Sequence, residues 1–364
     1  MAACKLLSGY RVLDMSQYIP GPYAARSLAD LGAEVIKIEP PSGDPMRGFM
    51  CQQREGGVSP LYRHLNRGKT VASLNLKEVA DRQKLARLLR GADVLLESYR
   101  PGVMARLGFD RDRLKALNPR LVHCALSGFG QSGPYCDRAG HDLTYCAAAG
   151  ALSASGTAER PVMTFPPMAD HAGAMQAVNM ILAALLGRER SGRGVFLDIS
   201  LTESILNWQY VGLLQPPDSG DTQREQLLLN GGAACYNIYA TADRKFVALA
   251  ALENKFWKAF CLRVEHPEWI ARQDEPLPQK TLIAELISLF AGHTQQQWQA
   301  ILAESDCCFE PIPERNESVN HPQFTARACL NGAAPGYPGW INEAPVETAS
   351  DYVELSAEET PLWH

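Results

Sequence analysis

The stretch RVLDMSQYIPGPYAARSLADLGAEVIKIE, residues 11–39, decides the fold. Residues 11–15 form a short apolar run that predicts a strand, and the turn signal Pro20-Gly21-Pro22 follows it. A segment with apolar residues at helical spacing comes next and ends at Gly32, before residues 33–39 form a second buried-type strand. Strand, helix and strand at this spacing predict a βαβ unit and therefore a parallel sheet.

The same alternation of strands and helices continues along the chain. It predicts strands at residues 70–74, 92–98, 121–126 and 195–200, and helices at 78–89 and 171–188. Several strands end in loops rich in Gly, Arg, Lys and Ser, and open parallel sheets bind ligands at the carboxyl ends of their strands. Because the first loop lacks the GxGxxG fingerprint, we do not expect a dinucleotide there.

Composition shifts after residue 214, where Pro, Gly, Ser and Asp gather as in a linker. Beyond this point the pattern predicts a β-hairpin and then helices rich in Trp, Leu and Phe, which together indicate a smaller α+β domain. The final segment has many Pro and Gly residues and few apolar runs, so it must pack onto another part of the protein. The predicted divisions are a large α/β domain at 1–214, a linker at 215–228, the small domain at 229–320 and the C-terminal segment at 321–364.

The composition indicates a folded protein without general affinity for nucleic acid or membranes. Of its 364 residues, 46% are hydrophobic and 21% charged, and the net charge is −5. No apolar run reaches the ~20 residues of a membrane helix, and residues 1–8 lack the apolar core of a secretory signal, so we expect a cytoplasmic protein. The ten cysteines lack the paired spacing of a zinc site, so they should be reduced and no metal is expected.

A histidine and a carboxylate stand out between residues 140 and 170. His141 follows Gly140, and Asp170 comes just before a predicted Ala-rich helix. Such a pair, facing each other across a substrate carbon, can take a proton from one face and return it on the other. The start of a helix favours an ionised carboxylate, so we expect Asp170 to be ionised.

The chain resembles the family III CoA-transferases, or CaiB/BaiF superfamily, a group that also contains α-methylacyl-CoA racemase. The resemblance covers nearly the whole chain and rests on the joint order of LSGYRVLD at 7–14, DLGAEVIKIE at 30–39, ESYRPGV at 97–103 and GFGQSGP at 128–134. It implies a Rossmann-like large domain and an interlocked homodimer, in which the C-terminal segment returns to the large domain. It also implies a site shared between the large domain of one chain and the small domain of the other.

Two branches of this group differ at the histidine. Transferases often carry tyrosine at the position of His141, whereas racemases resemble this chain in Gly140-His141-Asp142, in Asp170 and in LNGGA at 229–233 followed by Glu253. The resemblance therefore implies the racemase-like branch, with His141 and Asp170 as the proton-transferring residues. Asp142 or Glu253 would then orient His141, as neighbouring carboxylates do for imidazoles, and amides at the start of the helix after Asp170 would stabilise the enolate.

An acyl-CoA ligand needs cations for its phosphates and a slot for its pantetheine arm. The residues that we predict to bind it lie in or near the strand-end loops or the family motifs, and are Lys37, Arg67, Lys69, Ser98, Arg100, Arg106 and Tyr145. Many relatives place an arginine where this chain has Pro40, so adenosine binding would either rely more on Lys37 or Arg67 or be weaker.

Three functions remain open at this stage. The first is epimerisation of the α-carbon of a 2-methyl-branched acyl-CoA, which requires no metal, redox or prosthetic cofactor because coenzyme A enters as part of the substrate. The second is CoA transfer to a free acid, with Asp170 as a nucleophile that forms a mixed anhydride and then an aspartyl-CoA thioester. The third is a non-catalytic CoA-binding protein.

Overall fold

The computed structural model describes residues 5–49, 57–214, 224–332, 334–356 and 358–363. They form two compact units: the first contains the described residues up to 149, those of 165–208 and those from 322 onward, and the second contains the described residues of 150–164 and 209–321. Residues 150–164 were predicted in the large domain but group with the second unit. Of the predicted linker, residues 215–223 lie outside the described part of the chain.

The first unit is built on a seven-stranded sheet in the order β14-β3-β2-β1-β4-β5-β6, with every neighbouring pair parallel. The strands are β1 Arg11–Met15, β2 Glu34–Glu39, β3 Lys69–Ser73, β4 Val94–Glu97, β5 Val122–Ser127, β6 Phe196–Ser200 and β14 Val353–Glu354. This confirms the predicted α/β class and the parallel sheet.

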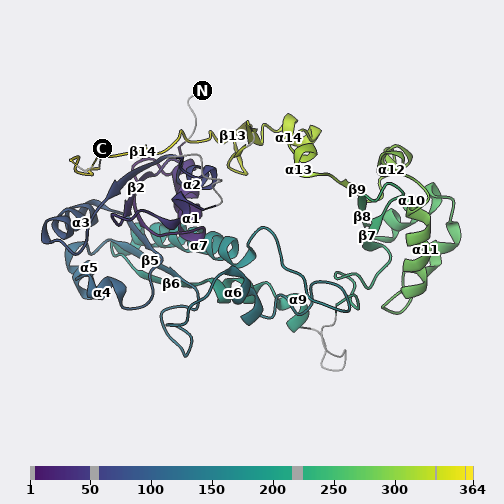
Figure 1. Ribbon diagram of the computed structural model, residues 1–364, viewed down its shortest axis with the longest axis horizontal. Coiled ribbons are helices and arrows are strands. Elements are labelled where there is room, and N and C mark those ends of the chain that lie inside the picture. The colour runs from purple at the N-terminus through teal and green to yellow at the C-terminus, as the bar shows by residue number, and fades with distance from the viewer. Residues whose placement is uncertain (1–4, 50–56, 215–223, 333, 357, 364) are drawn as a thin grey trace. The chain divides into compact units, whose positions relative to one another are not determined.

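Helices cover both faces of this sheet (Figure 1). Leucines of α3 and α5 pack on one face in a core with Leu13 and Ile36, and α1 packs against α7 on the other. The helices of the unit are α1 Pro20–Asp30, α2 Pro60–Asn66, α3 Val79–Gly91, α4 Val103–Arg106, α5 Arg111–Leu117, α6 Asp142–Ala148, α7 Met168–Ser191, α8 Leu201–Asn207 and α14 Pro322–Ala326, with a 3-10 turn η1 at Pro45–Arg47.

The βαβ unit predicted from residues 11–39 is present as β1, α1 and β2. Leu13 lies opposite Ile36 in the parallel ladder, and α1 begins at Pro20, where the missing amide proton costs no helical hydrogen bond. A Cβ at Gly21 would lie 2.1 Å from the Ser16 Cβ, so the turn from β1 into α1 has room only for glycine. The chain therefore leaves the carboxyl end of β1 in a tight turn.

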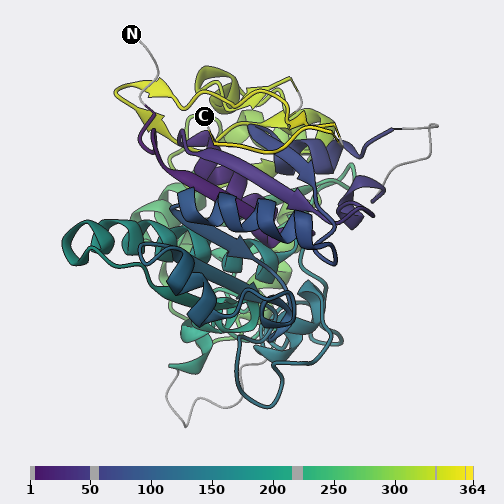
Figure 2. The same ribbon diagram turned by 90° about the vertical axis from the view of Figure 1, so that its left-hand side faces the viewer.

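The C-terminal segment packs on the first unit (Figure 2). Strand β14 adds to the free edge of β3, with Val353 opposite Thr70, and the Trp363 indole donates to the Leu88 carbonyl of α3 at 2.9 Å. Two short hairpins precede this strand, formed by β10 Leu330–Asn331 with β11 Ala334–Pro335 and by β12 Trp340–Ile341 with β13 Ala344–Pro345.

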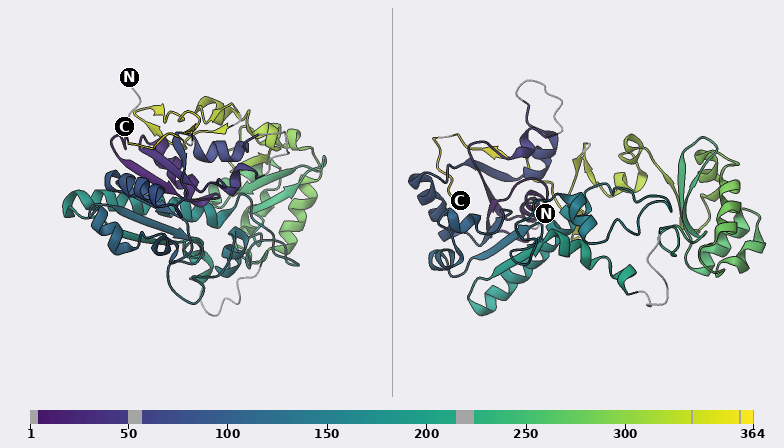
Figure 3. Two further views of the ribbon diagram at one scale, coloured as in Figure 1. Left: turned by 60° about the vertical axis from the view of Figure 1, so that its left-hand side comes forward. Right: turned by 60° about the horizontal axis from the view of Figure 1, so that its bottom comes forward.

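The second unit is a three-stranded antiparallel sheet with helices packed against it (Figure 3). Its core is aromatic, with Trp257, Phe260, Phe290 and Trp298 all buried. The predicted hairpin is present as β7 and β8, and a third strand, β9, was not predicted. The elements are α9 Tyr210–Leu213, β7 Tyr236–Ala240, β8 Phe246–Ala250, α10 Asn254–Arg263, the 3-10 turn η3 Pro267–Arg272, α11 Lys280–Phe290, α12 Gln295–Leu302, β9 Phe309–Ile312 and α13 Arg315–Ser318. No helix within the described ranges has both the length and the apolar composition to cross a bilayer.

Candidate functional site

An open pocket of about 320 Å³ lies in the first unit at the carboxyl ends of the parallel strands. Its walls come from the loops after β1, β4 and β5 and from the starts of α6 and α7. This is where a parallel sheet is expected to bind a ligand. The pocket brings together the predicted residues Ser98, Arg100, His141, Tyr145 and Asp170, and adds among others Gln17, Tyr18, Tyr99, Phe129 and Arg138.

Asp170 lies in the first turn of α7, and its charge state differs from the prediction. Burial, and after it the negative charge of Asp142, raise the pKa of Asp170 to about 7. The expectation that the helix start would keep this carboxyl group ionised is therefore wrong, because desolvation and the neighbouring carboxylate outweigh the helix dipole. Near neutral pH the Asp170 carboxyl group exists in both protonation states, as a group that both gives and takes protons must.

Asp142 supports Asp170 from the first turn of α6. Its Oδ1 accepts a hydrogen bond from the Asp170 amide at 3.0 Å, and its Oδ2 accepts one from the Cys146 thiol at 3.8 Å. The resemblance had implied that Asp142 would orient His141, and that amides at this helix start would bind an enolate. The Asp142 carboxylate holds the backbone of Asp170 and occupies the Asp170 amide, one of the amides at this helix start. The contribution of the other amides stays a prediction.

His141 lies immediately before α6 and is exposed in the pocket wall. Its amide donates to the Thr144 hydroxyl at 3.0 Å, and its ring meets the edge of the Tyr18 ring with the centroids 5.8 Å apart. Tyr18 has a φ of 64°, a left-handed conformation that is strained for an aromatic residue. Its amide donates to Asp44 at 3.3 Å, so the fold holds the Tyr18 ring against His141.

Tyr145 supports the loop that carries His141. Its buried ring lies so close to Gly128 and Gly140 that a Cβ at either glycine would come within 2.5 Å of it. The Tyr145 hydroxyl donates to the Gly140 carbonyl at 2.6 Å. Burial, followed by the charge of Asp170, raises the pKa of this hydroxyl. Tyr145 thus lines the pocket as predicted and also fixes the backbone next to His141.

Both predicted phosphate-binding lysines are fully buried in the first unit. Lys37 donates to the Asp44 carboxylate at 3.0 Å and to the Ser16 carbonyl at 2.7 Å. Lys69 donates to the Asp14 carboxylate at 2.8 Å, and burial lowers the pKa of Lys69 to about 8. Since both ammonium groups are bonded within the fold, this placement speaks against the predicted phosphate contacts. The hydrogen bonds of Lys37 and Lys69 instead stabilise the loop that follows β1.

Of the remaining predicted cations, only Arg100 lines the pocket. Arg67 is buried and pairs with Asp30 at 2.8 Å, so neither Arg67 nor Lys37 is available to compensate for Pro40. Arg106 is exposed on α4 and does not line the pocket, whereas the exposed Arg100 does. Arg138 also lines it and was not predicted, although its position two residues before Gly140 was a usable signal.

Glu253 lies in the second unit, where it is exposed and precedes α10. Its predicted contribution to the site therefore stays a prediction. The same holds for the interlocked homodimer that would bring a second chain to the pocket.

A carboxyl group with a pKa near 7, an exposed imidazole and an arginine at the carboxyl edge of a parallel sheet define an enzyme-type site for proton or acyl transfer. The family model described as CoA-transferase family III matches residues 7–361. The chain belongs to this family.

The chain has similar sequence identity to a racemase and to a CoA-transferase. It is 34% identical over 324 residues to the human alpha-methylacyl-CoA racemase, covering 86% of this chain and 80% of that protein. It is 31% identical over 331 residues to the acetyl-CoA:oxalate CoA-transferase of Acetobacter aceti, covering 88% and 84%. A solved CaiB/BaiF family protein from Brucella suis superposes with a TM-score of 0.82 at 27% identity, covering 95% of each chain.

Proposed function

We propose that this protein epimerises the α-carbon of a 2-methyl-branched acyl-CoA. The observation that carries the proposal is that His141 and Asp170 line one pocket, with the pKa of Asp170 raised to about 7. A two-base reaction requires two proton-exchanging groups in one pocket, and an imidazole and a carboxyl group are groups of this kind. Similarity to the human racemase supports the same assignment.

In the proposed reaction the thioester carbonyl acidifies the α-carbon. One of His141 and Asp170 removes the α-proton, and the electrons of the broken C–H bond form the enolate. The other residue then donates its proton to the opposite face, and the enolate electrons form the new C–H bond. The positive end of the α7 dipole next to Asp170 favours the developing negative charge. Arg100 is the proposed partner of a CoA phosphate, because it is an exposed cation in the pocket wall.

Incubation of a 2-methylacyl-CoA in heavy water tests the proposal. We expect deuterium at the α-carbon together with inversion of configuration. A His141→Ala variant should lose inversion, yet it should still exchange the α-proton of one enantiomer through Asp170. Absence of exchange with every branched acyl-CoA tested would overturn the proposal.

CoA transfer is the second candidate, and similarity to the Acetobacter aceti transferase favours it. Asp170 would then attack the thioester carbon and release the CoA thiolate, leaving an acyl-aspartyl anhydride. Hydroxylamine should in that case trap Asp170 as a hydroxamate, detectable by mass spectrometry, only when acyl-CoA is present. Binding of CoA without exchange or trapping would indicate the third, non-catalytic function.

We further propose that Glu253 of a second copy completes the site in an interlocked homodimer. A Glu253→Gln variant should then remain dimeric in light scattering and lose activity. Full activity of this variant, or of a monomer, would contradict the shared site.

Replacing Asp142 by asparagine should shift the pH dependence of activity. The amide oxygen can still accept the hydrogen bond from the Asp170 amide, but the negative charge that disfavours ionised Asp170 is gone. The pKa of Asp170 should therefore fall by about one unit, and the acidic limb of the pH–rate profile should move to lower pH by the same amount. An Asp137→Asn variant, at an exposed position outside the pocket, should leave the profile unchanged. An unmoved profile for Asp142→Asn would refute the electrostatic coupling.

Removing the Tyr18 ring should slow turnover more than it weakens binding. The ring packs edge-on against His141, and an aromatic pair of this kind contributes about 1 kcal/mol, so Tyr18→Ala should lower kcat about fivefold with a smaller change in KM. Tyr18→Phe keeps the ring and should restore kcat. A Tyr210→Ala variant, at an exposed tyrosine that does not line the pocket, serves as control. Equal loss in Tyr18→Phe and Tyr18→Ala would show that the hydroxyl, not the ring contact, matters.

A further inference from the structure

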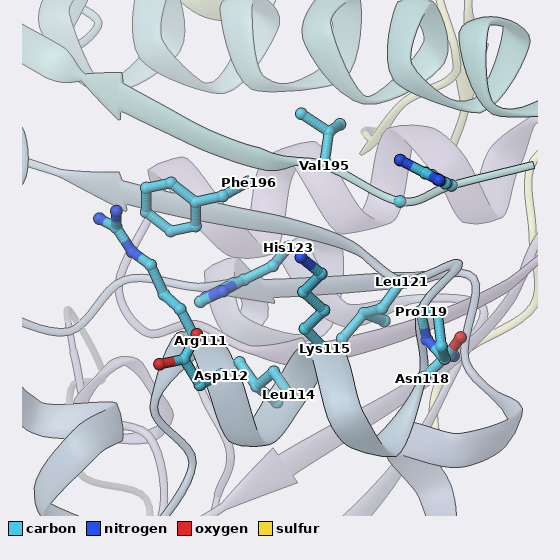
Figure 4. Close-up of a pocket in the computed structure, with 12 residues that line it drawn as sticks. Arg111, Asp112, Leu114, Lys115, Asn118, Pro119, Leu121, His123, Val195 and Phe196 are labelled. Atoms are coloured by element: carbon cyan, nitrogen blue, oxygen red, sulfur yellow. The ribbon is translucent and has the colours of Figure 1, made fainter. Parts of the chain in front are cut away.

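We propose a second ligand site, in a cavity of about 560 Å³ at the amino ends of β5 and β6, that binds a small organic anion with a flat apolar body (Figure 4). The cavity lies at the opposite ends of the strands from the candidate catalytic pocket. The proposal is therefore independent of the reaction. The cavity is lined by Arg111, Asp112, Leu114, Lys115, Asn118, Pro119, Leu121, His123, Arg193, Gly194, Val195 and Phe196.

Three cations surround this cavity. Arg111 and Lys115 are one helical turn apart on α5, so their side chains rise from the same face toward β5 and β6 (Figure 4). Arg193 joins them from the turn before β6. Among the described residues no salt bridge joins any of the three to a carboxylate, and Asp112 is the one acidic residue in the lining. This local positive charge, on a protein of net charge −5, attracts an anion.

Phe196, Leu114 and Leu121 give the cavity apolar wall residues beside its charged ones. The Phe196 ring has the Arg111 guanidinium 3.6 Å from its centroid and meets the edge of the His123 ring at 4.9 Å. Buried Leu114 and Leu121 extend this surface. Arginine stacks on aromatic faces and also binds carboxylate and phosphate groups. Because the Arg111 guanidinium covers a face of the Phe196 ring, a planar body would stack on this guanidinium while its anionic group contacts Lys115 and Arg193.

His123 contributes a buried polar group without a partner. Its side chain is 9% exposed, and its Nε2 has no hydrogen-bond partner in the described residues, lying 3.5 Å from a Glu97 carboxylate oxygen. A buried polar atom left in this state is uncommon in folded proteins. The His123 ring itself lines the cavity.

The backbone fixes the position of Arg193 at the rim. The Gly194 amide donates to the Pro119 carbonyl at 2.8 Å, and a Cβ at Gly194 would lie 2.0 Å from the Leu121 carbonyl oxygen. Only glycine permits so close an approach of the two segments. Main-chain packing thus sets where the backbone next to Arg193 lies at the rim of the cavity.

Fluorescence titration of a Phe196→Trp variant tests the proposal, because it places a reporter in the cavity wall. The probes are adenosine 5′-monophosphate for the phosphate source, indole-3-acetate for the carboxylate source, and inorganic phosphate as an anion without an apolar body. We expect saturable binding of at least one organic anion, weaker binding of inorganic phosphate, and weakening of both by salt. The same organic probe should raise the thermal unfolding midpoint of the unmodified protein. This measurement shows that binding does not depend on the Phe196→Trp substitution.

Charge removal then locates the binding. Lys115→Ala combined with Arg193→Ala should weaken the organic probe about tenfold or more, whereas Arg113→Ala should not, because this exposed arginine of α5 does not line the cavity. Arg100→Ala, in the candidate catalytic pocket, should also leave the affinity for the organic probe unchanged. The proposal is overturned if no organic probe saturates, if inorganic phosphate binds equally well, or if Arg113→Ala or Arg100→Ala matches the double variant.

Discussion

An Asp170→Asn variant is expected to lose catalysis and to be more stable than the unmodified protein at pH 8. The pKa of Asp170 is about 7 in the folded protein against an ordinary value of 3.8. Because the pKa of Asp170 is higher in the folded than in the unfolded protein, the free energy of unfolding falls as the pH rises from about 4 through 7. At pH 8 the folded protein bears the whole cost of a buried, ionised carboxylate beside Asp142. Asparagine removes this cost, which after allowance for solvent screening is about 2 kcal/mol.

Urea unfolding at pH 8 and at pH 4, together with α-proton exchange in heavy water, measures both effects. The gain in the free energy of unfolding should be present at pH 8 and nearly absent at pH 4. The exposed Asp137→Asn variant should change neither stability nor exchange. An Asp170→Asn protein that is less stable at pH 8 would show that the carboxylate stabilises the fold, and would remove the electrostatic basis of the proposed acid–base role.

Replacing Lys69 by methionine is expected to cost stability rather than acyl-CoA affinity. Lys69 is 1% exposed and bonds to Asp14, to the Pro22 carbonyl and to Asn66, so its removal leaves Asp14 buried without its closest cation. Breaking a buried ion pair from one side costs about 3–5 kcal/mol. The Kd for coenzyme A, measured on the folded fraction, should change little.

Two further variants make this result specific. Asp14→Asn combined with Lys69→Met should recover part of the lost stability, because the uncompensated charge is gone. Lys77→Met, at an exposed lysine of the same segment, should have almost no effect. If Lys69→Met instead keeps its stability and loses coenzyme A affinity, the phosphate-binding role predicted from the sequence is restored.

The fold was largely predictable because its strands are short apolar runs between turn signals. Arg11–Met15 and the strand ending at Glu39 match the predicted segments within a residue. Strand β14 has two residues, Val353–Glu354, and its pairing with β3 depends on contacts across most of the chain, so no local pattern could indicate it. The buried lysines did leave a signal, since Lys37 lies between Ile36 and Ile38 in a strand covered on both faces. A cation in such a place must be paired inside the protein.

The candidate site was predictable in its members but not in its electrostatics. His141 and Asp170 do line one pocket, as expected from their positions after strand-end loops. The pKa of Asp170 depends on Asp142, which is 28 positions away in sequence and contacts it only in the folded chain. The strained backbone of Tyr18 likewise leaves no mark in residue type.

The pairing of β14 with β3 also sets a limit on how the protein can fold during synthesis. Residues of the second unit are translated between the two strands, so β3 emerges long before its outer neighbour. Until Val353–Glu354 leaves the ribosome, the outer edge of β3 lacks its native partner and could recruit a strand from another nascent chain. The first unit therefore reaches its native sheet only after the residues of the second unit have been translated.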